Sequence, residues 1–238
     1  MICRVAERAL AARNVSRAIV ATDDQRIFDA VTSAGFEAWM TSPAHQSGTD
    51  RIAEVAASLD EARIIVNVQG DEPLLSSETI EQAVEIMTED SSAEIVTTWE
   101  PIESAADVTN PDVVKIVVDE SERAIYFSRS PVPYPRDAVR RFGTLESALL
   151  EEPDLIFGFR KHTGLYVYRR DVLLAFAKWP QSRLEQTESL EQLRALERGV
   201  RIRAIKASTA SIGVDTAEDL QRVRAIVSSS AFQVSSSE

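Results

Sequence analysis

Two acidic residues directly follow a short apolar run in the first half of the chain. Residues 64–68 are rich in β-branched side chains, which is typical of a buried strand, and Gly70, Asp71 and Glu72 come after them. Ligands of an open parallel sheet bind beyond the carboxyl ends of its strands. Mg²⁺ prefers one or two carboxylates together with substrate phosphates, so Asp71 is a candidate metal ligand. A polar turn after a strand is the alternative interpretation.

A second carboxylate, Asp215, lies at a similar junction near the end of the chain. Residues 212–216 lead from an extended stretch into a helix that we expect to begin at Thr216. Asp71 and Asp215 together could hold Mg²⁺ and neutralise a triphosphate. A plain helix cap is the alternative for Asp215.

A polar loop at residues 45–51 leads into another expected helix. Its hydroxyls, its backbone amides and a helix N-terminus would lie in one place, which suits contacts to ribose, base or phosphate. A capped loop without a ligand is the alternative. The candidate contacts are Ser47, Gly48, Thr49 and Arg51.

Polar residues of the second half could line a pocket for a sugar. His162 and Tyr166 would share one face of an expected strand, where they could contact a sugar or be half-buried core residues. Arg129 and Arg136 flank a proline-stiffened loop and could hold a carboxylate or phosphate, with surface salt bridges as the alternative. A helix expected over residues 185–198 would carry three polar side chains on one side, which could bind hydroxyls or face solvent: Glu188, Glu191 and Gln192.

The elements that position these residues follow two patterns. In the first half, expected strands at 17–21, 37–40 and 64–68 alternate with helices, which predicts βαβ units and a mainly parallel sheet. In the second half, residues 113–118 and 124–127 predict a hairpin. We expect one α/β domain over residues 1–227 and a disordered Ser-rich tail over 228–238.

Composition limits the class of protein. The 238 residues are 44% hydrophobic and 27% charged, with a net charge of −12, which argues against binding to nucleic acid or anionic membranes. Cys3 is the one cysteine, so no internal disulfide can form, which suits the cytoplasm. No apolar stretch approaches the ~18 residues that span a bilayer.

Taken together, these segments resemble the 3-deoxy-manno-octulosonate (Kdo) cytidylyltransferase family, the CMP-Kdo synthetases, over about residues 1–226. The combination of motifs is far more specific than any single one. The segments that carry the resemblance are 45–51, 66–73, 110–111, 126–129, 133–136, 162–168, 190–194 and 213–216.

The resemblance implies a Rossmann-like nucleotide-diphospho-sugar transferase fold and a homodimer, with the hairpin region used for dimerisation and sugar binding. It also implies the reaction of CTP with Kdo to give CMP-Kdo and pyrophosphate, with Mg²⁺, for lipopolysaccharide biosynthesis. By this resemblance, Asp71 and Asp215 correspond to the metal ligands of the family. The same two residues and Arg136 correspond to its catalytic residues. The residues that resemble the sugar-acid pocket are Gln69, Arg136, His162, Tyr166, Glu191 and Gln192, and those on the nucleotide side are Ser47, Gly48, Thr49 and Arg51.

The start of the chain departs from the family pattern. Members begin with a strand and a basic, glycine-containing loop that grips the triphosphate, whereas residues 1–5 here resemble the helix after that loop. We therefore expect either that the start of the chain is assigned too late or that the chain is truncated. For the 238 residues as they stand, we expect little or no activity. Two alternatives stay open: activation of another sugar acid, such as 8-amino-Kdo or a sialic acid, and a non-catalytic dimeric sugar-acid-binding protein.

Overall fold

The computed structural model describes residues 1–214 and 216–234. Contacts divide the chain into two compact units, and each is described by itself. The first unit comprises Met1–Asp60, Asn67–Gln82 and the described part of Ser208–Glu238, and the second comprises Glu61–Val66 and Ala83–Ala207. The expected single domain over residues 1–227 stays a prediction.

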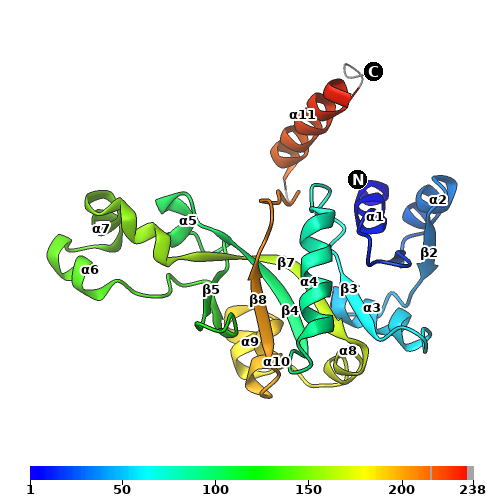
Figure 1. Ribbon diagram of the computed structural model, residues 1–238, viewed down its shortest axis with the longest axis horizontal. Coiled ribbons are helices and arrows are strands. Elements are labelled where there is room, and N and C mark those ends of the chain that lie inside the picture. Colours follow the sequence, from blue (N-terminus) through cyan, green and yellow to red (C-terminus); the bar gives the residue numbers. More distant parts are fainter. Residues whose placement is uncertain (215, 235–238) are drawn as a thin grey trace. The chain divides into compact units, whose positions relative to one another are not determined.

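The first unit contains a β-α-β motif (Figure 1). Strands β1 (Ile19–Thr22) and β2 (Glu37–Met40) run parallel, and α2 (Gln25–Ser33) connects them. The Asp24 carboxylate caps α2 by accepting a hydrogen bond from the Arg26 amide at 2.8 Å. Gly35 follows the helix with a φ of 83°, a conformation that favours glycine.

Helices complete the first unit. Val5 and Ala6 of α1 are buried, as are Ala53 of α3 and Val223 of α11, so each helix turns an apolar side inward. The helices are α1 (Ile2–Leu10), α3 (Gly48–Ala57) and α11 (Ala217–Val234), with the first turns of α4 (Ser77–Glu89).

Helix α11 continues past Ser228, where we expected the disordered tail to begin. Its sequence contains neither glycine nor proline to end a helix, which accounts for the continuation as far as Val234. Residues 235–238 lie outside the described residues. None of the helices among the described residues combines the length and the apolar character needed to cross a membrane.

The second unit is built on a sheet with the strand order β6-β5-β7-β4-β8, in which β3 also pairs with β7 (Figure 1). Hydrophobic side chains such as Ile95, Ile116, Val167 and Ile202 are buried on this sheet. The strands are β3 (Ile64–Asn67), β4 (Ile95–Pro101), β5 (Lys115–Val118), β6 (Ala124–Ser128), β7 (Arg160–Arg169) and β8 (Ile202–Lys206).

This sheet is mixed, whereas strands β1 and β2 of the first unit are parallel, as the alternation of strands and helices in the first half of the chain predicts. Strand β4 is parallel to β8 but antiparallel to β7, and β5 is antiparallel to both β6 and β7. The hairpin expected between β5 and β6 is confirmed. Its turn is held by the Asp119 carboxylate, which accepts from the amides of Ser121 and Arg123 at 2.8 and 2.9 Å.

Short helices surround the sheet, and several of them carry no periodic pattern long enough to predict. Helices α5 and α7 share a hydrophobic cluster with the end of β4, in which Val108, Leu149 and Phe159 are buried. The helices are α5 (Ala105–Thr109), α6 (Arg136–Phe142), α7 (Leu145–Glu151), α8 (Arg170–Phe176), α9 (Arg183–Glu188), α10 (Gln192–Glu197) and the 3₁₀ helix η1 (Pro153–Gly158).

Candidate functional site

Asp71 lies in the first unit, in the loop that follows β3. Its carbonyl oxygen accepts a hydrogen bond from the Val214 amide at 2.9 Å, so the segment that precedes Asp215 reaches this loop. The Asp71 side chain is half-buried, and within the described residues its carboxylate makes no hydrogen bond or ion pair. Asp215 itself lies outside the described residues, so its pairing with Asp71 stays a prediction.

Glu72 has a structural part in the same loop. Its carboxylate accepts a hydrogen bond from the Ser211 hydroxyl, and a Cβ added at Gly213 would lie 3.6 Å from its Oε1 atom. Glu72 therefore holds residues 211–213 beside the Asp71 loop and leaves Asp71 as the carboxylate available to a ligand. Within residues 1–214 and 216–234, no three acidic, histidine or cysteine side chains gather as a metal site.

The loop predicted on the nucleotide side begins α3. Ser47 caps the helix by accepting from the Asp50 amide at 3.2 Å. The Arg51 guanidinium donates to the Thr41 hydroxyl at 2.5 Å and forms an ion pair with Asp23 at 3.1 Å, which ties the loop to the ends of β1 and β2. Thr49 is buried.

Gln69 lies beside this loop within the first unit. A Cβ added at Gly48 would meet the Gln69 Oε1 atom at 3.7 Å, and both residues belong to the first unit. His162, Tyr166, Glu191, Gln192 and Arg136 belong to the second unit. The part assigned to Gln69 in sugar binding stays a prediction.

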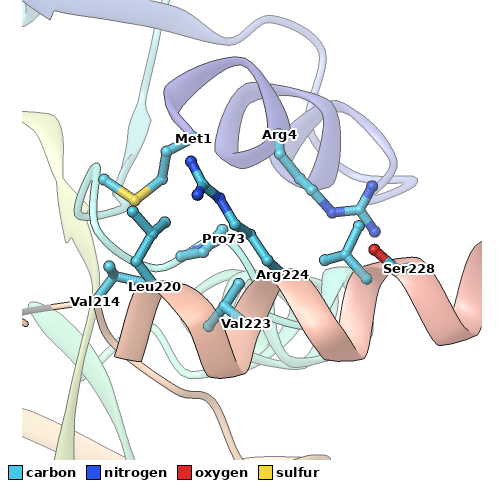
Figure 2. A pocket seen from close by; sticks show the side chains of 9 residues that line it. Met1, Arg4, Pro73, Val214, Leu220, Val223, Arg224 and Ser228 are labelled. Carbon is cyan, nitrogen blue, oxygen red and sulfur yellow. The ribbon is translucent and has the colours of Figure 1, made fainter. Parts of the chain in front are cut away.

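A pocket of about 500 Å³ adjoins the Asp71 loop within the first unit (Figure 2). Pro73 and Val214 line one part of it, and helices α1 and α11 supply other lining residues. In Figure 2 the guanidinium group of Arg224 points toward Met1, whereas that of Arg4 lies beside Ser228. The pocket therefore combines an apolar wall with two cationic groups, but its lining includes none of the predicted nucleotide contacts.

His162 and Tyr166 lie together on β7, as predicted. Their ring centroids are 5.3 Å apart, and Phe127 and Tyr168 extend the row at 5.0 Å from His162 and 5.7 Å from Tyr166. The alternation of side chains along the strand accounts for the shared face. The row contains one imidazole and two phenol groups, those of Tyr166 and Tyr168.

Burial keeps both of these groups neutral. Desolvation lowers the pKa of His162 from 6.5 to about 3, and it raises the pKa of Tyr166 well above 10. The nearby Thr97 hydroxyl opposes this rise in pKa, but its geometry does not make a hydrogen bond, so the buried Tyr166 hydroxyl has no hydrogen-bond partner among the described residues. A buried donor without a partner carries a free-energy penalty that a ligand oxygen would remove.

The prediction of one helix over residues 185–198 is wrong, because the chain forms two helices there, α9 and α10. Ser189 has φ 52° and ψ 48°, a left-handed conformation that ends α9, and Glu191 precedes the first residue of α10. Glu188, Glu191 and Gln192 therefore do not line one side of a single helix. The Glu188 carboxylate accepts from the Ser128 hydroxyl at 2.8 Å and is engaged structurally.

The two predicted arginines differ in their surroundings. The Arg129 guanidinium donates to the carbonyl oxygens of Glu188, Pro111 and Ser189 at 2.7, 2.8 and 3.3 Å, so it braces the backbone. Arg136 is exposed at the start of α6, and its side chain has no hydrogen bond or ion pair with the described residues. Arg136 is therefore the one of these two whose guanidinium is available to a ligand.

Comparison with known proteins identifies the family. A family model described as Cytidylyltransferase matches residues 1–202. The 3-deoxy-manno-octulosonate cytidylyltransferase of Syntrophotalea carbinolica is 47% identical over 225 residues, which cover 94% of this chain and 87% of that protein. That of Geotalea daltonii is 49% identical over 223 residues, with coverage of 94% and 86%. The chain belongs to the 3-deoxy-manno-octulosonate cytidylyltransferase family.

A solved structure confirms the predicted fold class for this cytidylyltransferase. CMP:2-keto-3-deoxy-manno-octonic acid synthetase, complexed with CTP, superposes with a TM-score of 0.85 at 41% identity. The match covers 96% of this chain and 88% of that one. At that similarity the α/β architecture and the central sheet are shared.

Three residues near the candidate site residues of the second unit were not predicted from the sequence. Lys115 is fully buried, and its ammonium group donates to the carbonyls of Asn110 and Val113 at 2.8 and 2.6 Å. The sequence held one signal for this buried lysine, because it lies inside a run of β-branched residues that predicts a buried strand. Thr97 and Arg194, which contact His162 and Glu191, carried no local signal because these contacts depend on tertiary structure.

Proposed function

We propose that this protein transfers the cytidylyl group of CTP to Kdo, giving CMP-Kdo and pyrophosphate. The relatives named for this reaction support the proposal, and they favour Kdo over 8-amino-Kdo or a sialic acid. The observation on this chain that carries it is the polar face of β7. There a neutral imidazole lies beside the buried Tyr166 hydroxyl, which has no hydrogen-bond partner among the described residues and could donate to a sugar acid.

The reaction depends on positioning the two substrates and requires no covalent intermediate with the protein. The anomeric hydroxyl of Kdo attacks the α-phosphorus of CTP in line, and the bond to pyrophosphate breaks as the new oxygen–phosphorus bond forms. In this scheme His162 accepts a hydrogen bond from a sugar hydroxyl and Tyr166 donates one to a sugar oxygen. Arg136 offers an exposed guanidinium for an anionic group, and residues 47–51 contact the nucleotide.

We propose Mg²⁺ as the cofactor, held by Asp71 and Asp215. The half-buried Asp71 carboxylate, which has no partner among the described residues, is a hard oxygen donor of the kind that Mg²⁺ prefers. Bound there, Mg²⁺ would offset the negative charge of the phosphates and orient the attacking oxygen.

We also propose a homodimer that acts in the cytoplasm in lipopolysaccharide biosynthesis. Leu150 and Phe157 are each 77% exposed in α7 and η1, and Tyr134 is 59% exposed in the proline loop. Large apolar side chains exposed in one region favour contact with a second copy. A single cysteine suits the cytoplasm, and a CMP-activated Kdo is the form in which this sugar would be added to lipid.

A panel of sugar acids tests the substrate. Pyrophosphate release is measured with CTP and Mg²⁺ in the presence of Kdo, 8-amino-Kdo or a sialic acid. We expect the highest kcat/KM with Kdo. Release with a sialic acid alone would assign another substrate, and binding of Kdo without release would indicate a non-catalytic protein.

A further inference from the structure

We propose that Thr97 is a positioning residue that holds His162 in the tautomer protonated at Nε2, so that Nδ1 is the hydrogen-bond acceptor offered to the sugar acid. The tautomer follows from the structure of the chain alone. The consequence for the sugar rests on the proposed function, in which His162 contacts Kdo.

Thr97 is fully buried and lies on β4, opposite Tyr166 of β7. The register of the two strands shifts between Thr97 and Trp99, and His162 pairs with Trp99. The Thr97 hydroxyl oxygen lies 2.9 Å from His162 Nε2 and 2.8 Å from the Leu165 carbonyl oxygen. One hydroxyl therefore contacts two polar atoms of the neighbouring strand.

The number of hydrogens at this hydroxyl decides the tautomer. A threonine hydroxyl has one hydrogen to donate and two lone pairs that accept. A carbonyl oxygen can only accept, so the single hydrogen of Thr97 points to Leu165. Toward His162 the hydroxyl can then only accept, which requires a hydrogen on Nε2.

The remaining ring nitrogen is left as an acceptor. Burial of the ring keeps His162 neutral, and a neutral imidazole carries one hydrogen, so Nδ1 has a free lone pair. Nδ1 makes no hydrogen bond with the described residues. An acceptor at His162 and a donor at Tyr166 thus stand side by side on β7, an arrangement that fits a sugar hydroxyl next to a carboxylate or ring oxygen.

The chain supplies a matched control for testing this. Thr98 is the next residue of β4 and is equally buried, but its hydroxyl contacts the Thr163 hydroxyl and not His162. Thr97→Val and Thr98→Val each remove one buried hydroxyl with little change of shape. Thr97→Ser keeps the hydroxyl and serves as the rescuing variant.

The first readout is the ¹⁵N NMR spectrum of the histidine rings, recorded without substrate. The chain has two histidines, so His45→Gln assigns the signals of His162. We expect a single Nε2-protonated tautomer in the wild type, in Thr98→Val and in Thr97→Ser, and a mixture or the other tautomer in Thr97→Val. An Nδ1-protonated ring in the wild type, or an unchanged ring in Thr97→Val, would overturn the proposal.

The second readout is steady-state kinetics. Thr97→Val should raise KM for the sugar acid roughly threefold to tenfold, as expected for one weakened hydrogen bond, while KM for CTP stays unchanged. Thr98→Val and Thr97→Ser should keep the wild-type KM. A tautomer change without a change in KM would contradict the positioning role. A chain that turns over no sugar acid would refute the proposed function but leave the tautomer test decisive.

Discussion

His162 stays neutral over the pH range in which most histidines titrate, because burial lowers its pKa to about 3. Tyr166 beside it stays protonated for the same reason. These two residues and Asp71 were predicted from the sequence, because a strand and a strand-end loop place them by local pattern. Thr97 could not be predicted, because its contact with His162 depends on the register between β4 and β7.

The lowered pKa of His162 predicts a loss of stability in acid. Between a pKa of about 6.5 in the unfolded chain and about 3 in the folded one, only the unfolded chain binds this proton. The stability is therefore fully present above about pH 6.5 and falls as pH decreases, with a slope of at most about 1.4 kcal/mol per pH unit.

Urea denaturation between about pH 7 and about pH 5 checks this prediction. The free energy of unfolding should fall less steeply in His162→Gln than in the wild type. His45→Gln is the comparison variant, because it removes the other histidine and leaves the buried ring of His162 in place. Equal slopes in the wild type and His162→Gln would contradict the buried, neutral state of this ring.

Tyr166→Phe should separate stability from sugar binding. The substitution removes a buried hydroxyl that makes no hydrogen bond within residues 1–214 and 216–234, so the free energy of unfolding should stay constant or rise by about 1 kcal/mol. KM for the sugar acid should rise, because the ligand loses a hydrogen bond. Urea denaturation and initial rates measure the two effects, and a loss of stability with an unchanged KM would show that the hydroxyl serves the fold instead.

At the scale of elements, the break between α9 and α10 sets the position of Glu191. The Arg194 guanidinium binds the buried Glu185 carboxylate at 2.8 and 2.5 Å, lies 4.5 Å from the Phe176 ring and reaches Glu191 at 3.4 Å. The sequence predicted one helix here because its helical pattern contains no glycine or proline at the break. Ser189 adopts the left-handed conformation without such a signal.

Arg194→Ala should therefore be strongly destabilising. Removing one partner of a buried ion pair leaves the Glu185 carboxylate uncompensated, which costs about 3–5 kcal/mol. The matched control is Arg141→Ala at the exposed pair with Glu152, which should cost about 1 kcal/mol or less. Urea denaturation compares the two variants, and similar losses in both would contradict a structural role for the buried pair.

The other elements show where sequence patterns succeed. Residues 37–40 were predicted as a strand and form β2 with the same bounds, and the hairpin of β5 and β6 was predicted from β-branched runs around an acidic turn. Helices α5, α6 and α7 were missed, because five to seven residues are too few for a helical period to stand out. The directions of the β1–β2 pair and of the β5–β6 hairpin were predicted, but the antiparallel pairing of β4 with β7 was not, because it depends on which distant strands become neighbours.

At the scale of the whole molecule, the predicted contacts to the two substrates fall in different units, except for Gln69, a predicted sugar contact that belongs to the first unit. The Asp71 loop and the nucleotide-side loop belong to the first compact unit, and the polar face of β7 belongs to the second. The family and the fold class were predicted from the combination of motifs, and the comparisons confirm both. The division into units was not predicted, because it depends on contacts between distant segments.

Substitutions in the two units should therefore change different kinetic constants. A Cβ in Gly48→Ala would meet Gln69 at 3.7 Å, an ordinary contact, so the fold should tolerate it while the backbone loses access to the nucleotide. KM for CTP should rise on the order of tenfold, which corresponds to about 1.4 kcal/mol of binding free energy, and KM for the sugar acid should stay unchanged. Gly158→Ala is the control, because its Cβ would meet no atom within 4 Å. A rise in both constants for Gly48→Ala would contradict the division.

The most direct test of the proposed reaction is a ³¹P NMR spectrum of the protein incubated with CTP, Kdo and Mg²⁺. Because the sequence predicts low activity for these 238 residues, we expect the CTP signals to be replaced slowly, by a phosphodiester of CMP-Kdo and by pyrophosphate in equal amounts. A chelator should abolish the change, and Asp71→Asn should reduce its rate by orders of magnitude. Unchanged CTP, or its conversion to CDP and inorganic phosphate, would contradict cytidylyl transfer by this chain.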